Sequence, residues 1–332
     1  MTAIELTYLS GPDVDALALT DEEILGSVRD VLAAQGRGET VIEPRMHLFP
    51  RGAQGHFNVL RGATPEHAGV KVVGDYVENH RLGLPSELAL LLLMNPATGV
   101  PEAIIDATAI TEMRTGAVTA IGAEYLARRQ ARTLGHIGAR GTAYWNVRLL
   151  RHVLGGLEEI RVHSRRPESR EAFARRLSAD LGCEVRPVGT WEECVRGADV
   201  IVEASRLTEP APLLLTQWIA PGALVIPYGT VSAVELELTD IMDKVVVDDW
   251  GQAGVGPLGA LRAHVDSGRL TEANLHAELG QIVSGARTGR EHESETILFW
   301  HRGLSITDIA LGRTLLRKSR ALGAGTRLPY RA

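Results

Sequence analysis

The chain has 332 residues, 45% of them hydrophobic and 23% charged, which is typical of a soluble globular protein large enough for two domains. Its formal net charge of -6 excludes the strong positive field that nucleic-acid binding requires. The longest apolar run, residues 88–94, is too short to cross a bilayer, and the first residues do not resemble a secretion signal. The two cysteines lack C-x-x-C spacing and a nearby histidine cluster, so we expect no metal site. We therefore expect a cytoplasmic protein that binds neither membranes nor nucleic acids.

The first elements predicted along the chain are a helix and an antiparallel sheet. Thr20 and Glu23 form a capping box before an amphipathic helix that ends at Gly36. From residue 41 to about residue 94, short apolar runs separated by glycine, proline and asparagine are typical of strands. In the first of these runs, alternation places Ile42, Met46 and Leu48 on one face and Glu43, Arg45 and His47 on the other.

A long helix is predicted from Ala109 to Arg129, with Arg114 near its amino-terminal end. After it, six apolar segments between residues 132 and 249 are separated by stretches that mostly leave room for helices. This pattern is typical of a doubly wound parallel sheet that is buried on both faces. From about residue 294 onward, the chain is predicted to form one closing helix that returns to the first domain.

The residues that follow the first parallel strand nearly match the dinucleotide-binding turn G-x-G-x-x-G/A, but Arg140 stands where the motif has its second glycine. In one interpretation, Gly138 makes the tight turn, the next helix offers its N–H groups to a pyrophosphate, and Arg140 itself binds a phosphate. In the other interpretation, the fold persists and the cofactor has been lost. The predicted cofactor-binding residues of the turn are Gly138, Ala139, Arg140 and Gly141.

The end of the second parallel strand bears on the choice of cofactor. An enzyme that uses NAD carries an acidic residue there, which holds the ribose 2′-hydroxyl. This chain instead has Ser164, Arg165 and Arg166, and guanidinium groups pair well with a 2′-phosphate. The sequence therefore favours NADP over NAD, with a solvated basic loop as the alternative.

The order of these features resembles the ornithine cyclodeaminase and mu-crystallin family over almost the whole chain. The resemblance rests on the stretches PRMHLF, GVKVVG, NPATGVPEAIIDATAITEMRTGAVTAIGAEYLA, VVVDDWGQA and GLSITDIALG. It implies an α/β fold in which a Rossmann-type doubly wound parallel sheet domain, residues 126–299, is inserted into a second domain. This second domain, residues 1–125 and 300–332, would be an α+β domain that binds substrate and forms a homodimer. The resemblance also implies nicotinamide-linked chemistry on amino acids and imines.

Carried over residue by residue, the resemblance implies that Arg45 and Arg114 bind the substrate carboxylate and that Lys71 lies beside the reacting carbon and nitrogen. Two guanidinium groups can clamp a small carboxylate. A lysine whose pKa is lowered by neighbouring arginines can exchange a proton with an imine. His47, on the same strand face as Arg45, either lines the pocket or caps a loop.

Thr230 stands where the cyclodeaminases of the family carry an aspartate that holds the substrate's amino group. Family members that reduce ketimines lack this aspartate, so we expect an NAD(P)H-dependent reductase. Its substrate would be a small imine with a carboxylate, either a cyclic ketimine or the imine of a 2-oxo acid. The predicted catalytic residues are Lys71 and Arg114, and Arg45, His47 and Thr230 are predicted to contact the substrate as well. The alternatives are an amino-acid cyclodeaminase with a different amine anchor and a ligand-binding protein without turnover.

Overall fold

The structure is a computed structural model that describes residues 3–139 and 141–331. It divides into two compact units: unit 1 with Met1–Arg114 and Gly303–Ala332, and unit 2 with Thr115–Arg302. Among the described residues, no helix is both long enough and apolar enough to span a membrane.

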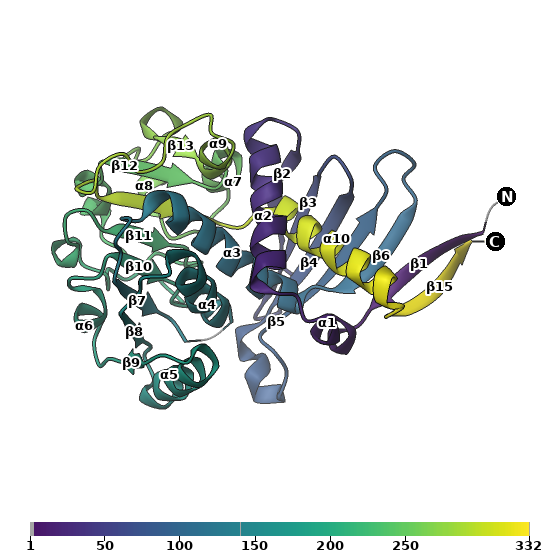
Figure 1. Cartoon of the computed structure of the whole chain (residues 1–332), viewed down its shortest axis with the longest axis horizontal. Coiled ribbons are helices and arrows are strands. Elements are labelled where there is room, and N and C mark those ends of the chain that lie inside the picture. The colour runs from purple at the N-terminus through teal and green to yellow at the C-terminus, as the bar shows by residue number, and fades with distance from the viewer. Residues whose placement is uncertain (1–2, 140, 332) are drawn as a thin grey trace. The chain divides into compact units, whose positions relative to one another are not determined.

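Unit 1 is built on a mostly antiparallel sheet (Figure 1). Within the described part of the chain, seven strands lie in the order β15-β1-β6-β5-β4-β3-β2, and β1 with β6 is the one parallel pair. The elements of this unit are β1 (Ile4–Leu9), α1 (Gly11–Leu17), α2 (Asp21–Gly36), β2 (Val41–Leu48), β3 (His56–Ala63), β4 (Ala68–Asp75), η1 (Val77–Leu82), β5 (Glu87–Met94), β6 (Pro101–Asp106), α10 (Ser305–Leu322) and β15 (Thr326–Arg331). The helix α3 (Thr108–Leu126) begins in unit 1 and ends in unit 2.

The helix α10 lies across the sheet of unit 1 and packs against α2, β3, β4 and β5. The start of α2 is confirmed, because Thr20 Oγ1 accepts the Glu23 N–H and the Glu23 carboxylate accepts the Thr20 N–H. The buried face of α10 is mostly apolar, with Leu311 and Leu315, but it also includes Asp308. This packing places one buried carboxylate against the strands that carry the predicted site residues.

The pairing of β2 with β3 contains a register shift between Glu43 and Met46. Beyond the shift, Met46 and Leu48 are exposed, whereas Arg45 and His47 are half-buried. Arg45 and His47 therefore share a face, as alternation predicted, and it is the less exposed face of the strand.

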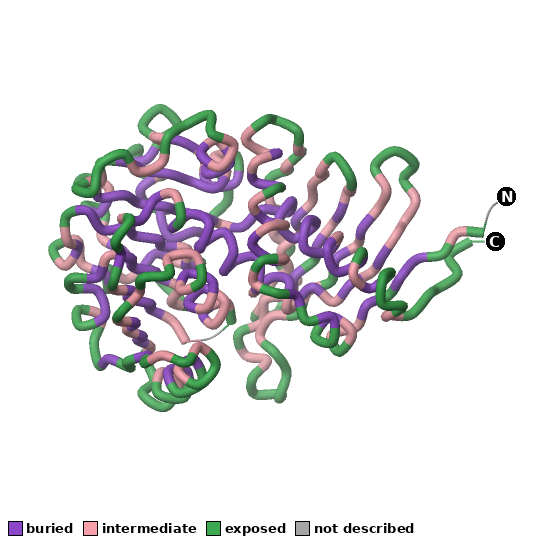
Figure 2. The backbone as a smooth tube through the Cα atoms, viewed as in Figure 1, coloured by how far each residue is buried: buried purple, intermediate pink, exposed green. Residues whose placement is uncertain are grey.

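Unit 2 is a doubly wound parallel sheet with helices, which confirms the predicted fold class. Over the residues described, eight parallel strands lie in the order β13-β12-β14-β11-β10-β7-β8-β9, and Figure 2 shows them largely buried. The chain runs outward from β7 in both directions, so the topological switch point lies between β7 and β10. The elements are β7 (Thr133–Ile137), α4 (Ala143–Leu154), β8 (Glu159–His163), α5 (Pro167–Leu181), β9 (Val185–Pro187), α6 (Trp191–Val195), β10 (Val200–Glu203), η2 (Thr216–Trp218), β11 (Leu224–Pro227), η3 (Leu236–Ile241), β12 (Lys244–Val247), α7 (Trp250–Ala253), α8 (Arg262–Asp266), η4 (Glu272–Asn274), β13 (Ala277–Glu278), α9 (Leu279–Val283) and β14 (Ile297–Trp300).

The prediction of one closing helix from about residue 294 is wrong for the first part of that segment. Ile297–Trp300 form β14, which pairs with β11 and β12 in the middle of the parallel sheet. All four side chains are buried, so the strand shows no alternation by which it could be told from a helix. The helix α10 begins only at Ser305, beyond Gly303.

Candidate active site

Lys71 is the centre of a buried polar cluster in unit 1. On β4 its side chain alternates with that of Val72, which is partly exposed, and Lys71 is only 1% exposed. Its Nζ lies 2.5 Å from Asp308 Oδ1, on the first turn of α10, and 3.2 Å from Thr111 Oγ1, on the first turn of α3. Three elements that are far apart in the sequence therefore meet at one ammonium group.

The surroundings of Lys71 lower its pKa to about 8. The largest cause is burial, which disfavours the charged form, and the positive charges of Arg114 and Arg45 act in the same direction. Asp308 opposes them, because its negative charge and its hydrogen bond favour the ammonium. A lysine with this pKa can both give and take a proton near neutral pH.

Arg45 and Arg114 meet at the backbone of Gly303. The Arg45 Nη2 donates to the Gly303 carbonyl at 3.2 Å, and the Arg114 Nε donates to Asp308 Oδ1 at 3.1 Å. A Cβ at Gly303 would overlap the Arg114 guanidinium, and the φ of +84° at this residue also favours glycine. The structure thus brings Arg45, Lys71 and Arg114 together in unit 1.

Asp308 and Thr111 are members of this cluster that were not predicted from the sequence. Asp308 carries the charge. Its Oδ1 accepts from both Lys71 and Arg114, while its buried Oδ2 has no hydrogen-bond partner among the described residues. The signal was present in the sequence, because Asp308 stands four residues after Leu304 and three before Leu311, in the apolar row of its helix. A carboxylate in such a row must find a buried partner.

The other two predicted substrate residues have different surroundings. The His47 ring lies near those of Phe49 and His56, with centroid distances of 6.0 and 5.7 Å. Thr230 belongs to unit 2, where its carbonyl accepts the Gly259 N–H at 2.8 Å. Contact of either residue with a substrate stays a prediction.

The described residues of the turn after β7 share two features with a dinucleotide-binding turn, a glycine that cannot be replaced and a helix that follows. Gly138 has a φ of +115°, and a Cβ there would lie 2.7 Å from the Ala204 carbonyl oxygen, so glycine is required. Its N–H donates to the His163 carbonyl at 2.8 Å, and α4 begins five residues later. A Cβ on Gly141 would meet no atom within 4 Å. Space for an anion is therefore present beside the helix N-terminus. Binding of a pyrophosphate at this turn stays a prediction, and Arg140 lies outside the described residues.

The predicted 2′-phosphate residues follow β8 at the carboxyl end of the sheet. The Ser164 hydroxyl donates to the Arg166 carbonyl at 3.2 Å, and Arg166 precedes α5. Both Arg165 and Arg166 are exposed. They follow β8, which pairs with β7, the strand before the glycine turn. In dinucleotide-binding domains, residues at this position contact the adenosine ribose.

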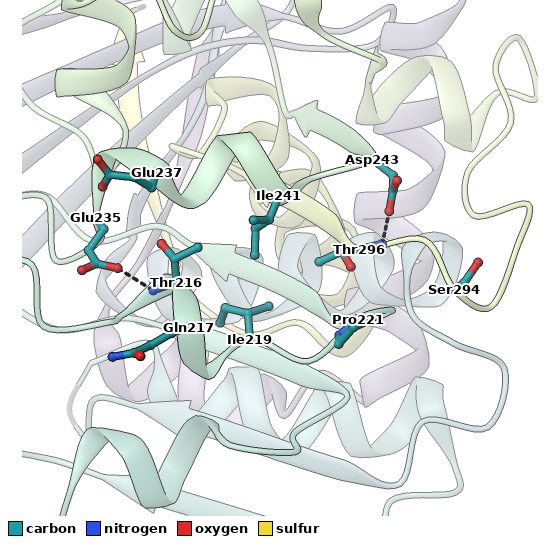
Figure 3. A pocket seen from close by; sticks show the side chains of 10 residues that line it. All are labelled: Thr216, Gln217, Ile219, Pro221, Glu235, Glu237, Ile241, Asp243, Ser294 and Thr296. Carbon is teal, nitrogen blue, oxygen red and sulfur yellow. Dashed lines mark hydrogen bonds between the residues drawn. The ribbon is translucent and has the colours of Figure 1, made fainter.

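A surface pocket of about 730 Å³ lies elsewhere in unit 2 (Figure 3). It is lined by Thr216, Gln217, Ile219, Pro221, Glu235, Glu237, Ile241, Asp243, Ser294 and Thr296. Asp243 and Thr296 immediately precede β12 and β14, and Pro221 lies three residues before β11, so the pocket opens at the amino ends of the strands. Ligands of such sheets bind at the carboxyl ends, and the pocket is therefore not a candidate for the dinucleotide site.

Glu203, the last residue of β10, is fully buried, and its Oε2 has no hydrogen-bond partner among the described residues. Burial raises its pKa to about 7, although its Oε1 accepts the Ser205 N–H at 2.7 Å. The folded protein therefore holds this proton more tightly than the unfolded chain does. The stability that results is fully present below the unfolded pKa of 4.5 and is lost as the pH rises through about 7.

We expect Glu203→Gln to remove the part of the pH-dependent loss of stability that comes from Glu203. The free energy of unfolding of the unmodified protein should fall by up to roughly 3 kcal/mol between pH 5 and pH 8 on account of this group, and that of the variant should not. Urea unfolding at intervals of one pH unit measures the difference. Glu184→Gln, at an exposed position, is the matched control. Parallel pH profiles for Glu203→Gln and the unmodified protein would contradict the expectation.

The fold and the buried polar cluster define a Rossmann-type α/β protein whose unit 1 holds a buried lysine near two arginines. The chain belongs to the ornithine cyclodeaminase/mu-crystallin family, because the model of that family matches residues 7–321. Among curated proteins, it is 30% identical to the ketimine reductase mu-crystallin of Mus musculus over 245 residues, which cover 73% of each chain.

Two solved structures resemble the chain over nearly its whole length. One is the Δ1-pyrroline-2-carboxylate reductase of Thermococcus litoralis in complex with NADH and L-proline, with a TM-score of 0.89, 29% identity, and coverage of 97% of this chain and 99% of the other. The second is an archaeal alanine dehydrogenase dimer with bound NAD, with a TM-score of 0.90, 27% identity, and coverage of 98% and 100%.

Proposed function

We propose that the protein is an NAD(P)H-dependent reductase of a small imine that carries a carboxylate. The observation that carries this proposal is the buried Lys71 held between Asp308 and Thr111, with Arg45 and Arg114 beside it. The names of the three relatives support it, since two are a ketimine reductase and a pyrroline-2-carboxylate reductase and the third is an amino-acid dehydrogenase with bound NAD. The substrate would be a cyclic ketimine or the imine of a 2-oxo acid.

Arg45 and Arg114 would bind the substrate carboxylate. Both guanidinium groups reach Gly303, and the Arg114 Nε is already engaged by Asp308. The salt bridge to Asp308 fixes the orientation of Arg114, so little freedom is lost when the carboxylate binds. A carboxylate held in this way keeps its neighbouring imine carbon at a fixed distance from Lys71.

Lys71 would donate the proton that the reaction requires. When bound, a nicotinamide dinucleotide would supply a hydride for the imine carbon. Reduction leaves a nitrogen that must be protonated, and Lys71 Nζ is the buried donor of the cluster whose lowered pKa lets it release a proton near neutral pH. Asp308 keeps Lys71 oriented and stabilises its charge before the proton leaves, and Thr111 Oγ1 accepts a second hydrogen bond from it.

The experiment that tests the proposed function follows the absorbance of NADH and NADPH with two kinds of substrate. We expect oxidation of the cofactor with 1-pyrroline-2-carboxylate, or with pyruvate and ammonia, and release of the corresponding amino acid. Ornithine should give no proline. Proline and ammonia formed from ornithine without net oxidation or reduction of the cofactor would instead identify a cyclodeaminase, and cofactor binding without turnover of any substrate would indicate a ligand-binding protein.

The cofactor is predicted to be NADP in preference to NAD, because Arg165 and Arg166 follow β8. Replacing both residues with alanine should weaken NADPH binding by about ten-fold, as expected for the loss of a charge-assisted hydrogen bond, and leave NADH binding unchanged. Titration of nicotinamide fluorescence at fixed salt measures both affinities. Arg186→Ala, which removes an exposed arginine paired with Glu159, is the control. Equal affinity of the unmodified protein for the two cofactors would defeat the prediction.

We also propose that the protein is a homodimer formed by unit 1. The face of its sheet opposite to Lys71 carries large apolar side chains that are substantially exposed in the single chain: Met46 (56%), Leu48 (59%), Val72 (38%), Leu88 (47%) and Leu90 (50%). These side chains lie on neighbouring strands. Val72 of β4 pairs with Leu90 of β5 on one side and with Val59 of β3 on the other. A continuous apolar surface of this kind is typical of an interface between subunits.

A further inference from the structure

Glu203 ends the strand β10 directly beside the glycine turn that follows β7. The next residue, Ala204, donates its N–H to the Ile137 carbonyl at 2.9 Å. A Cβ on Gly138 would lie 2.7 Å from the Ala204 carbonyl oxygen, so the loop after β10 packs against the turn. Because β7 and β10 flank the topological switch point, this loop lies at the edge of the predicted dinucleotide site.

The carboxyl group of Glu203 lies between the loop after β10 and the loop after β11. Its Oε1 accepts the Ser205 N–H at 2.7 Å, whereas its buried Oε2 has no hydrogen-bond partner among the described residues. A Cβ on Gly229 would lie 3.0 Å from this Oε2, 3.2 Å from the Ser205 carbonyl oxygen and 3.3 Å from the Val231 carbonyl oxygen. Three oxygen atoms from the two loops therefore line one small space, which the absence of a side chain at Gly229 leaves open.

The protonation of Glu203 decides whether these oxygens repel or attract one another. Both carbonyls and an ionised carboxylate can only accept hydrogen bonds, so the ionised form places three acceptors around one buried space. The neutral form carries its proton on Oε2, since Oε1 already accepts from Ser205, and this proton can be donated to a carbonyl of either loop. Burial raises the pKa of Glu203 to about 7, so both forms are populated near neutral pH.

The strands on either side of Glu203 place no titratable group opposite it. Glu203 pairs with Ile137 of β7 and Pro227 of β11. The titratable residues next to these two, His136 and Tyr228, contact Asn146 of α4, and alternation along β7 directs His136 to the other face of the sheet.

The helices on the Glu203 face carry two buried titratable groups, Cys194 of α6 and His264 of α8. Burial raises the pKa of Cys194 to about 12 and lowers that of His264, so both are neutral at pH 7. Arg206, in the loop after β10, is exposed. Among the described residues, no charged side chain contributes to the pKa of Glu203, which reflects burial and contacts with Ser205 and Gly229.

We propose that Glu203, in its neutral form, is a positioning residue that joins the loops after β10 and β11 and so holds the dinucleotide site in the form that binds. The hydrogen bond from Oε2 is lost when the carboxyl group ionises. Binding of the dinucleotide therefore favours the protonated protein and is accompanied by uptake of a proton. The inference rests on the proposed function, because it takes the ligand to be a nicotinamide dinucleotide.

Fluorescence titration of NADH between pH 6 and pH 8 at fixed ionic strength tests the proposal. NADH suits this test because it lacks a 2′-phosphate, so its charge does not change in this range, and NADPH serves as the second ligand. The Kd of NADH should rise by roughly five- to ten-fold from pH 6 to pH 8, as expected when the binding form is the protonated one. Calorimetric titration at pH 8 in buffers of different ionisation enthalpy should show uptake of roughly one proton per NADH bound.

Glu203→Gln separates positioning from a merely structural role. Glutamine keeps an acceptor for Ser205 and replaces the Oε2 proton by an N–H donor that does not ionise. This variant should bind NADH at pH 8 as tightly as the unmodified protein does at pH 6, with no dependence on pH. Glu203→Met fills the same space without donor or acceptor and should bind weakly at every pH. Glu184→Gln, at an exposed position, should keep the pH dependence.

Thermal unfolding at each pH separates loss of binding from loss of folding. Equal affinity of the unmodified protein for NADH at pH 6 and pH 8, or binding without proton uptake, would overturn the inference while leaving the reductase intact. A decline of the same size in folded Glu203→Gln would also overturn it. Failure of the unmodified protein to bind either dinucleotide at any pH would overturn the proposed function as well.

Discussion

Replacing Lys71 with methionine is expected to lower kcat by roughly 10²- to 10⁴-fold, the range for loss of a general acid or base. The KM should change much less, because the carboxylate is bound by Arg45 and Arg114, and the proton moves only as the transition state forms. Methionine approximates the length of lysine without its charge, so the buried space stays filled. Steady-state kinetics with a saturating cofactor measures the effect.

The pH dependence of kcat provides an independent check on this role of Lys71. Reduction needs the protonated ammonium, and its pKa is lowered to about 8, so kcat should fall as the pH rises through about 8. This basic limb should vanish in Lys71→Met. Lys318→Met, which removes a lysine paired with Glu23 on the surface of α10, is the control for loss of a lysine. A variant at Lys71 with unchanged kcat, or with the same basic limb, would contradict the assignment.

Replacing Asp308 with asparagine is expected to destabilise the protein by about 3–5 kcal/mol, the cost of leaving a buried charge without its partner. Both Lys71 and Arg114 are less than a tenth exposed, and Asp308 Oδ1 accepts hydrogen bonds from both. Asparagine keeps the shape of the side chain but removes the negative charge that balances them. Denaturant unfolding measures the loss, with Asp266→Asn, in an exposed i,i+4 pair with Arg262, as the control.

The same substitution should also move the pH profile of kcat. Asp308 is the group that raises the pKa of Lys71 against the effect of burial. Without it, Lys71 loses its proton at lower pH, so the basic limb of kcat should shift toward acid. A stable Asp308→Asn protein with an unshifted limb would show that the carboxylate is not coupled to Lys71.

The sequence predicted those parts of the fold whose signals are local. The capping box at Thr20, the antiparallel strands and the six parallel strands all follow from patterns within a few residues. β14 was missed because a strand at the centre of a parallel sheet is buried on both faces and so shows no alternation. β1 and β15 pair with each other from opposite ends of the chain, and no local pattern joins them.

The candidate site could be predicted only in part, for a related reason. Arg45, Lys71 and Arg114 were found through motifs, whereas the residues that hold them lie far away in sequence. Asp308 is 237 residues from Lys71, and Gly303 is 258 residues from Arg45.

If hydride passes from a nicotinamide to the carbon of a carboxylate-bearing imine, transfer of an isotope label will show it. The protein is incubated in ordinary water with 1-pyrroline-2-carboxylate and NADPH or NADH that carries deuterium at C4 on either face, and the product is analysed by mass spectrometry and NMR. We expect proline with one deuterium at its α carbon from one of the two labelled faces. Proline without deuterium from both faces, or retention of all label in the cofactor, would contradict it.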